Sequence, residues 1–194
     1  SRDWTRIALW LVGSTMAYNV LEAVISLWAG MRAQSVALIG FGLDSVIECA
    51  AAGFMLWRLS VEARGGDGEK VEAAERKVGR FIGGTFLALV IYVLIESGLA
   101  LLHREHSSES VVGIVLASAS LVIMPIMSWG KFRAAANIGS ASLRAEAKET
   151  LACAYLSFTL LIGLVANAVA GWWWADPVAA LVMVPWLVRE GVEG

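Results

Sequence analysis

Asp44 and Glu48 are two acidic side chains in a segment that is otherwise almost wholly apolar. They are four residues apart, so on a helix both project from one face, one turn from each other. Two carboxylates at that spacing repel unless a cation lies between them or one carries a proton. Glu149 and Cys153 repeat the spacing in a second apolar segment. Together the four side chains could coordinate a borderline-soft ion such as Zn²⁺ tetrahedrally, so we predict a metal site formed by them.

Each of these residues also has a purely structural interpretation. The acidic pair of the first segment could be protonated, or could form hydrogen bonds between helices. Glu149 could form a salt bridge with Lys148 or Arg144, although neither spacing favours that contact on a helix. Cys153, taken alone, is typical of a small buried apolar side chain. The metal site is therefore a hypothesis that depends on the two segments meeting.

Six carboxylates in all lie within apolar segments, and they are Glu22, Asp44, Glu48, Glu96, Glu146 and Glu149. An ionised group at the centre of a bilayer costs about 2.5–3.5 kcal/mol even on a lenient scale, so these side chains should face a protein interior. We expect Asn19 and Glu22 to line the cavity of the metal site or to bond a neighbouring helix. We expect Glu146 to be an accessory or proton-handling group rather than a ligand.

The elements that must position these residues are membrane spans. A span needs about 20 mostly apolar residues, and 58% of this chain is hydrophobic while only 16% is charged. The absence of sustained alternation favours helices over a barrel. We expect an all-α integral membrane protein with one transmembrane domain, residues 1–194, and no cytoplasmic C-terminal domain. The six expected transmembrane helices cover residues 5–29, 35–59, 79–102, 110–130, 140–170 and 175–188.

Lysine and arginine predict the orientation of these spans. Arg32 and Arg104 fall on one side of the membrane, and twelve basic residues fall on the other. This excess predicts a multi-pass protein of the inner membrane with both termini in the cytoplasm. Residues 60–78 are expected to be a flexible cytoplasmic connector, and His103 and His106 are expected in an external loop. The twelve basic residues are Arg2, Arg6, Arg58, Arg64, Lys70, Arg76, Lys77, Arg80, Lys131, Arg133, Arg144 and Arg189.

A short internal repeat relates the second and fifth spans. Residues 35–48 read SVALIGFGLDSVIE and residues 140–153 read SASLRAEAKETLAC, which matches Asp44 to Glu149 and Glu48 to Cys153. Related halves with a polar site between them are typical of secondary transporters. Small residues at positions 40, 42, 145 and 147 are expected to let these two spans approach closely.

These motifs, together with GWWWADPVAAL at the start of the sixth span, resemble the transmembrane half of the cation diffusion facilitator (cation efflux) family. That family exchanges divalent metal ions for protons. The resemblance implies that Asp44, Glu48, Glu149 and Cys153 are the metal ligands. Here Glu149 and Cys153 stand where the family carries His and Asp, and the family's usual cytoplasmic metal-binding domain is not in the sequence.

The resulting hypothesis is a metal/proton antiporter that exports Zn²⁺ or a related ion, with metal and protons as its partners in the lipid bilayer. The alternative is a membrane metal-binding, sensor or scaffold protein that does not transport, and a channel is a third interpretation. No enzyme activity and no resident cofactor are expected. The net charge of -2 gives no reason to expect nucleic acid. Gly79 and Gly83 form a close-packing motif that could support a homodimer.

Overall fold

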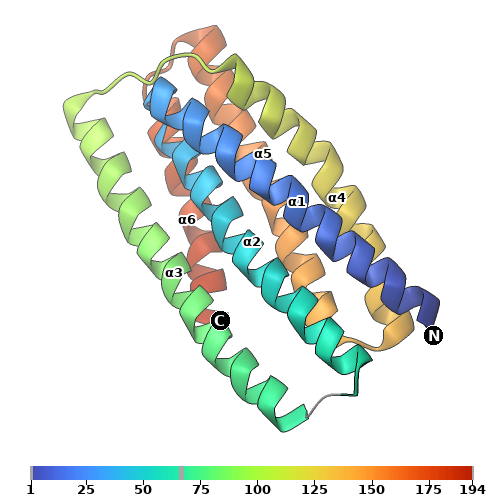
Figure 1. Cartoon of the computed structure of the whole chain (residues 1–194). Helices are drawn as coiled ribbons and strands as arrows, with labels where there is room; N and C mark the ends of the chain where they lie inside the picture. The colour runs from blue at the N-terminus through green and yellow to red at the C-terminus, as the bar shows by residue number, and fades with distance from the viewer. Residues whose placement is uncertain (1, 66–67, 194) are drawn as a thin grey trace.

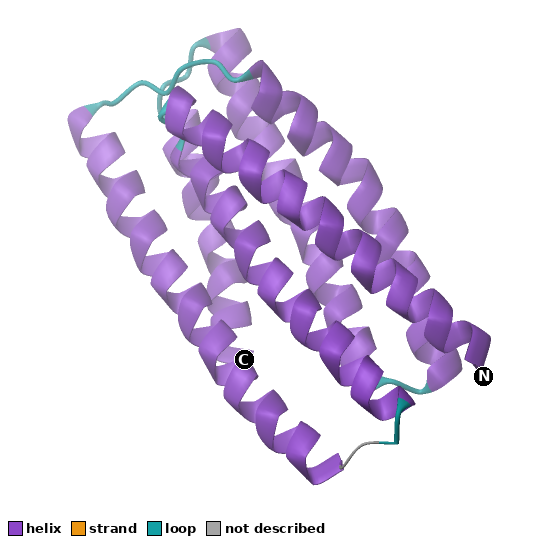
Figure 2. Cartoon of the chain, in the orientation of Figure 1, coloured by secondary structure: helices purple, strands orange, loops and turns teal. Residues whose placement is uncertain are grey.

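Six α-helices account for nearly all of residues 2–65 and 68–193, the parts of the chain that the computed structural model describes (Figures 1 and 2). The connections between the helices are short. In chain order the helices are α1 (Arg2–Ala33), α2 (Val36–Ala63), α3 (Gly68–His103), α4 (Val111–Ile138), α5 (Ala141–Ala170) and α6 (Ala175–Glu193).

The helices run up and down and form one bundle (Figure 1). Around its outside, α1 packs against α2 and α4, α4 packs against α5, and α6 packs against both α5 and α3. Helix α2 closes the ring by packing against α3, and it also contacts α5 and α6 across the middle. The residues predicted to bind metal lie on α2 and α5, so this central contact is the one that matters for function.

Two residues, Gly139 and Ser140, stabilise the turn between α4 and α5. Gly139 ends α4 with a φ of 72°, a left-handed conformation that glycine adopts at little cost. Ser140 then caps α5, because its side chain accepts a hydrogen bond from the Leu143 amide at 3.2 Å. With only these two residues between them, α4 and α5 must run antiparallel as close neighbours.

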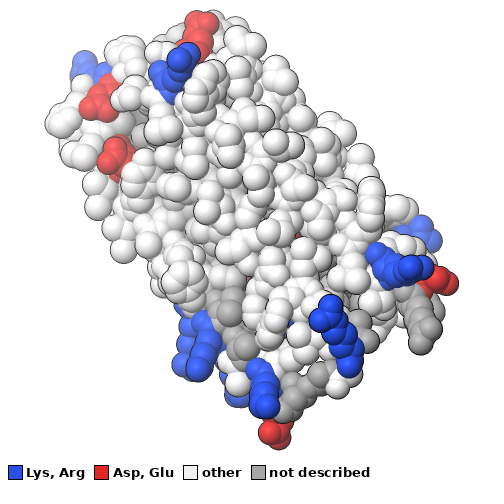
Figure 3. Space-filling view, viewed as in Figure 1, with Lys and Arg blue, Asp and Glu red and all other residues white. Residues whose placement is uncertain are grey.

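Five of the described helices are long and apolar enough to cross a membrane, judged by length and composition. Helix α6 has 19 residues and is not among them, although it lies alongside α3 and α5 in the same bundle. Figure 3 shows a broad uncharged middle on the face in view, with Lys and Arg gathered mainly at the lower end. The candidate spans are Asp3–Ala33, Val36–Val61, Gly79–His103, Val111–Ile138 and Ala141–Ala170.

Several boundaries differ from the sequence-based expectation. The predicted connector 60–78 is mostly helical, since α2 continues to Ala63 and α3 begins at Gly68. Its Glu, Ala, Lys and Arg content suits a helix that projects from the membrane. Helix α4 also continues to Ile138, eight residues beyond the predicted end. His103 is the last residue of α3, and only His106 lies in the following loop.

The glycines predicted to bring α2 close to α5 serve other contacts. A Cβ at Gly42 would lie 2.6 Å from the Ser26 hydroxyl of α1, and one at Gly40 would lie 3.4 Å from Val93 of α3. Gly83 packs within the chain, because a Cβ at Gly191 of α6 would lie 3.2 Å from its carbonyl oxygen. Homodimer formation through the Gly79–Gly83 motif stays a prediction.

Candidate metal centre

Asp44, Glu48 and Cys153 meet in the interior of the bundle. One ligand atom from each lies within 4.8 Å of the other two. The three residues are 2%, 9% and 0% exposed, so the cluster is enclosed by protein. Two carboxylates and one thiol this close together can accept a cation between them, and carboxylate and thiolate are both ligands of Zn²⁺.

Glu149, the fourth predicted ligand, lies outside this cluster. Helices α2 and α5 are antiparallel, and contact between Arg58 and Ser142 fixes their relative height near one end. The next level toward the middle of the bundle holds Ala51 of α2 and Glu149 of α5, which line one cavity. The level after that holds Glu48 and Cys153, whose ligand atoms meet in the cluster. Glu149 therefore sits about one turn from the cluster on the side of the chain termini. The repeat aligns Glu149 with Asp44 in sequence. Because α2 and α5 run in opposite directions, these two aligned residues lie on opposite sides of the level at which Glu48 and Cys153 meet.

Asn19 of α1 contacts the cluster directly. Its Nδ2 donates a hydrogen bond to Oε2 of Glu48 at 3.1 Å, and its side chain is 1% exposed. Its Oδ1 and the Oδ2 of Asp44 are buried without a hydrogen-bond partner among the described residues. Buried acceptors are nearly always satisfied in proteins, so two unsatisfied oxygens, one within the cluster and one beside it, are consistent with a site for a cation.

Glu22 of α1 supports Cys153 from the other side. Its carboxylate accepts hydrogen bonds from Ser45 at 2.6 Å, from Ser120, and from the Cys153 thiol at a sulfur–oxygen distance of 3.6 Å. The side chain is completely buried. Helices α1, α2, α4 and α5 thus converge on one carboxylate, which orients the thiol. Ser45 was visible in the repeat, but the sequence contained no signal for Ser120.

The structure corrects the prediction for Lys131, which was counted among the basic residues on the cytoplasmic side. It is fully buried, and its Nζ donates to Oε1 of Glu146 at 2.7 Å and to Thr150 at 2.9 Å. Because α4 continues past residue 130, Lys131 stays on the same buried helix face as Met124 and Ser128. The spacing of Lys131 from Met124 and Ser128 was the feature of the sequence from which its burial could have been predicted. Glu146 is thus an ion-paired residue whose Oε2 has no hydrogen-bond partner among the described residues.

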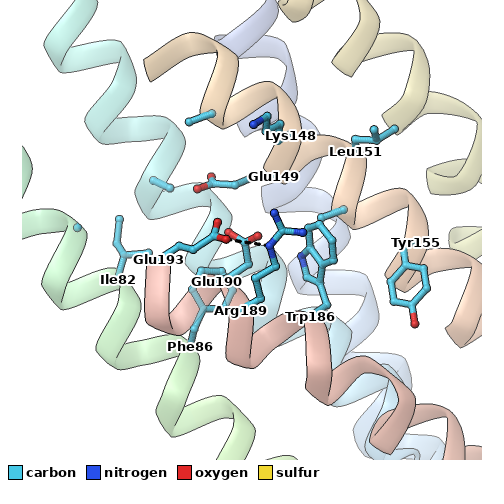
Figure 4. Close-up of a pocket in the computed structure, with 14 residues that line it drawn as sticks. Ile82, Phe86, Lys148, Glu149, Leu151, Tyr155, Trp186, Arg189, Glu190 and Glu193 are labelled. Carbon is cyan, nitrogen blue, oxygen red and sulfur yellow. Dashed lines mark hydrogen bonds and ion pairs between the residues drawn. The ribbon is translucent and has the colours of Figure 1, made fainter. Parts of the chain in front are cut away.

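A cavity of about 710 Å³ opens beside the cluster, between α2, α3, α5 and α6. Its wall includes Glu149 and three residues from the last turns of α6, namely Arg189, Glu190 and Glu193 (Figure 4). A smaller cavity of about 150 Å³ shares Glu149 and reaches Glu146. The predicted sixth span stopped at residue 188, so these α6 residues were missed.

Comparison with known proteins gives the chain its family. Residues 14–193 match the cation efflux transmembrane domain. The chain is 27% identical over 151 residues to "Uncharacterized transporter sll1263" of Synechocystis sp. (strain ATCC 27184 / PCC 6803 / Kazusa), covering 76% of this chain and 48% of that protein. It is 29% identical over 173 residues to "Uncharacterized transporter YdbO" of Bacillus subtilis (strain 168), covering 86% of this chain and 58% of that protein.

The chain thus spans about half the length of the curated relatives that it matches. The matched region includes all of the residues of the buried cluster and both residues of α1 that contact it. A helical bundle with membrane-spanning segments and a family match over almost its whole length leads to one conclusion: this chain belongs to the cation efflux family of transporters.

Proposed function

We propose that this protein transports a divalent transition-metal cation, with Zn²⁺ as the leading candidate, and exports it from the cytoplasm in exchange for protons. The observation that carries the proposal is the meeting of Asp44, Glu48 and Cys153 in the bundle interior, with ligand atoms within 4.8 Å of one another. Buried carboxylates are costly in a membrane and typically mark a path for ions or protons.

The donor set indicates the class of metal. A thiolate favours Zn²⁺ and softer ions over Mg²⁺ and Ca²⁺, which prefer oxygen ligands. Asp44, Glu48 and Cys153 supply three ligands, and we propose Glu149 as the fourth, reached when α5 shifts relative to α2. Asn19 and Glu22 then orient Glu48 and Cys153 from α1, as outer groups commonly do around metals. Glu146 is placed with them as an accessory group, held by Lys131.

Metal binding at these residues supplies the coupling to protons. A thiol must lose its proton to become a ligand, and a protonated carboxyl must do the same, so binding a metal releases protons. When protons return from the other side, they compete for the same ligands and release the metal. This gives exchange by mutually exclusive occupancy of one site, without a separate proton channel.

The proposed topology gives the direction of access. All six helices cross the inner membrane, including the shorter α6, within the single transmembrane domain 1–194. The cavity that contains Glu149 is also lined by the last turns of α6, which point toward the end of the bundle where most Lys and Arg residues gather (Figure 3). By the positive-inside rule this end and both termini face the cytoplasm. The arrangement is then an inward-open one, ready to receive metal.

The experiment is metal uptake by proteoliposomes under an imposed pH gradient, with Zn²⁺, Cd²⁺, Fe²⁺, Mn²⁺, Co²⁺ and Ni²⁺ tested in parallel. A pH-sensitive dye in the lumen reports proton movement. We expect uptake of at least one metal with opposite proton flux, and its loss in Glu48→Ala. Transport by Glu48→Ala at the wild-type rate for every metal would show that the proposed site is wrong.

The same assay separates the two alternatives. A non-transporting sensor or scaffold would bind metal in detergent but show no uptake. A channel would show uptake that is independent of the pH gradient and without opposite proton flux. Exporter, sensor and channel therefore give three different combinations of binding, metal flux and proton flux.

A further inference from the structure

We propose that Glu190 and Glu149 form a second binding site for the divalent cation, in the cavity of about 710 Å³ on the side of the bundle where the chain termini lie. This vestibule site would capture hydrated metal before it reaches Asp44, Glu48 and Cys153. The inference rests on the proposed transport function and adds Glu190 of α6, a residue outside the predicted site, to the path of the ion.

The two carboxylates come from neighbouring helices. Glu149 lies on α5 and Glu190 lies in the last turns of α6, and the two carboxyl groups interact electrostatically across the cavity (Figure 4). Neither makes a hydrogen bond or an ion pair with any residue that the structure describes. Glu193 differs, because Nε of Arg189 donates to its Oε1 at 2.9 Å. The vestibule thus holds two carboxylates that make no hydrogen bond or ion pair with a described residue, and two like charges so placed favour a cation between them.

A separate observation in a second cavity, which shares Glu149 with the first, supports a cationic ligand. Glu146 lines the smaller cavity of about 150 Å³ that shares Glu149. Its side chain is 8% exposed, and its Oε1 is bound to Lys131 while its Oε2 has no partner among the described residues. A buried carboxylate oxygen without a donor is uncommon, so this smaller cavity next to Glu149 has an acceptor available for a metal-bound water.

The basic residues nearby leave the vestibule open to a cation. Lys131 is committed to Glu146 and Thr150. Arg189 contacts both Glu193 and the ring of Trp186, and it attracts Glu190 electrostatically without forming an ion pair with it. Lys148 also lines the cavity, but its side chain is exposed at the rim. Because Glu149 and Glu190 are only partly buried, a metal held there would keep several of its waters and bind weakly. Weak, multiple sites suit conduction, since an ion must also leave each one.

Glu149 connects the vestibule to the central cluster. It is four residues, and hence one turn of α5, from Cys153. A cation held by Glu190 and Glu149 can therefore exchange Glu190 for Cys153 and Glu48 while Glu149 stays bound. This order gives Glu149 a role in both sites and explains its position between them.

The test compares Glu190→Gln with wild type in initial rates of Zn²⁺ uptake, at low and high ionic strength. We expect the KM for Zn²⁺ to rise roughly five- to tenfold at low salt with kcat unchanged, because one charge is lost from a partly exposed site. High salt should narrow the difference, since it screens exposed charges. Glu190→Asp keeps the charge and should restore the wild-type KM. Glu109→Gln removes one exposed charge from the opposite end of the bundle and serves as the matched control.

Zn²⁺ binding to the purified protein by equilibrium dialysis gives a second measurement. We expect a tight and a weak site in wild type, loss of the weak one in Glu190→Gln, and loss of the tight one in Glu48→Gln. A Glu190→Gln protein with the KM and both binding sites of wild type would overturn the vestibule site and leave the central site intact. A wild-type protein that neither binds nor transports any of the metals would overturn the proposed function itself, and this inference with it.

Discussion

The buried ion pair between Lys131 and Glu146 makes the sharpest prediction about stability. The lysine is fully buried, the glutamate side chain is 8% exposed, and the Nζ–Oε1 distance is 2.7 Å. Removing only the lysine, as in Lys131→Met, leaves a carboxylate in the interior with no opposite charge. Breaking a buried pair in this way typically costs 3–5 kcal/mol, so we expect a destabilisation of roughly that size.

The double variant Lys131→Met, Glu146→Gln tests the physical reason for this cost. Both charges are then absent, and replacing a buried ion pair by uncharged side chains of similar volume is often close to neutral. We expect the double variant to recover most of the stability lost in Lys131→Met. This recovery would not occur if the lysine acted through its hydrogen bond to Thr150 alone.

The assay is thermal unfolding in detergent, followed by the fluorescence of the nine tryptophans. For a chain of this length, 1 kcal/mol shifts Tm by roughly 2–4 °C, so Lys131→Met should lower Tm by about 6–20 °C. Lys148→Met, an exposed lysine on α5, is the matched control and should change Tm by less than a few degrees. Equal losses of stability in the single and double variants, or unfolding of Lys131→Met at the wild-type temperature, would contradict a stabilising role for this ion pair.

Three further predictions concern the candidate metal site and a helix contact outside it. Cys153→Ser replaces a soft ligand by a hard one, so the affinity for Cd²⁺ relative to Mn²⁺ should fall on the order of tenfold in competition binding. Asn19→Ala removes the 3.1 Å hydrogen bond to Glu48, and the Kd for Zn²⁺ measured by titration calorimetry should rise about tenfold with the fold unchanged. Asp176→Ala removes the acceptor for the Ser35 hydroxyl and for the Val36 amide at 2.9 Å, so thermal unfolding should report a loss of about 1–3 kcal/mol and unchanged metal selectivity.

The sequence was sufficient to predict the helices and the pairing of α2 with α5, because apolar length and carboxylates four residues apart are local signals. It placed Glu48 and Cys153 on facing helices, and the structure brings their ligand atoms together with that of Asp44. The level of Glu149 along the bundle, relative to Asp44, Glu48 and Cys153, could not be predicted in the same way. A repeat in sequence gives matched positions, whereas the direction of the two helices decides whether those positions lie at one level.

Lys131 and Glu190 show a second limit, which concerns where a helix ends. Positive charge is a reliable sign of a membrane boundary only when the helix stops there, and α4 continues through Lys131 to Ile138. The lysine is then carried into the interior by the same spacing that buries Met124 and Ser128. Glu190 was excluded for the opposite reason, since the apolar stretch stops before α6 does. In both cases the apolar segment was recognised from the sequence, but the full length of the helix was not.

The placement of Glu22 gives the Cys153 thiol a fixed position beside the carboxylates of the proposed site. A buried thiol with no acceptor would behave as a small apolar side chain and could rotate away from the carboxylates. Here the thiol donates to Glu22, which Ser45 and Ser120 hold from α2 and α4, so the sulfur is fixed beside Glu48. A Glu22→Gln variant would keep this volume but weaken that support. In the proposed site, the choice of metal would therefore depend on α1 and α4 as well as on α2 and α5, which carry the proposed ligands.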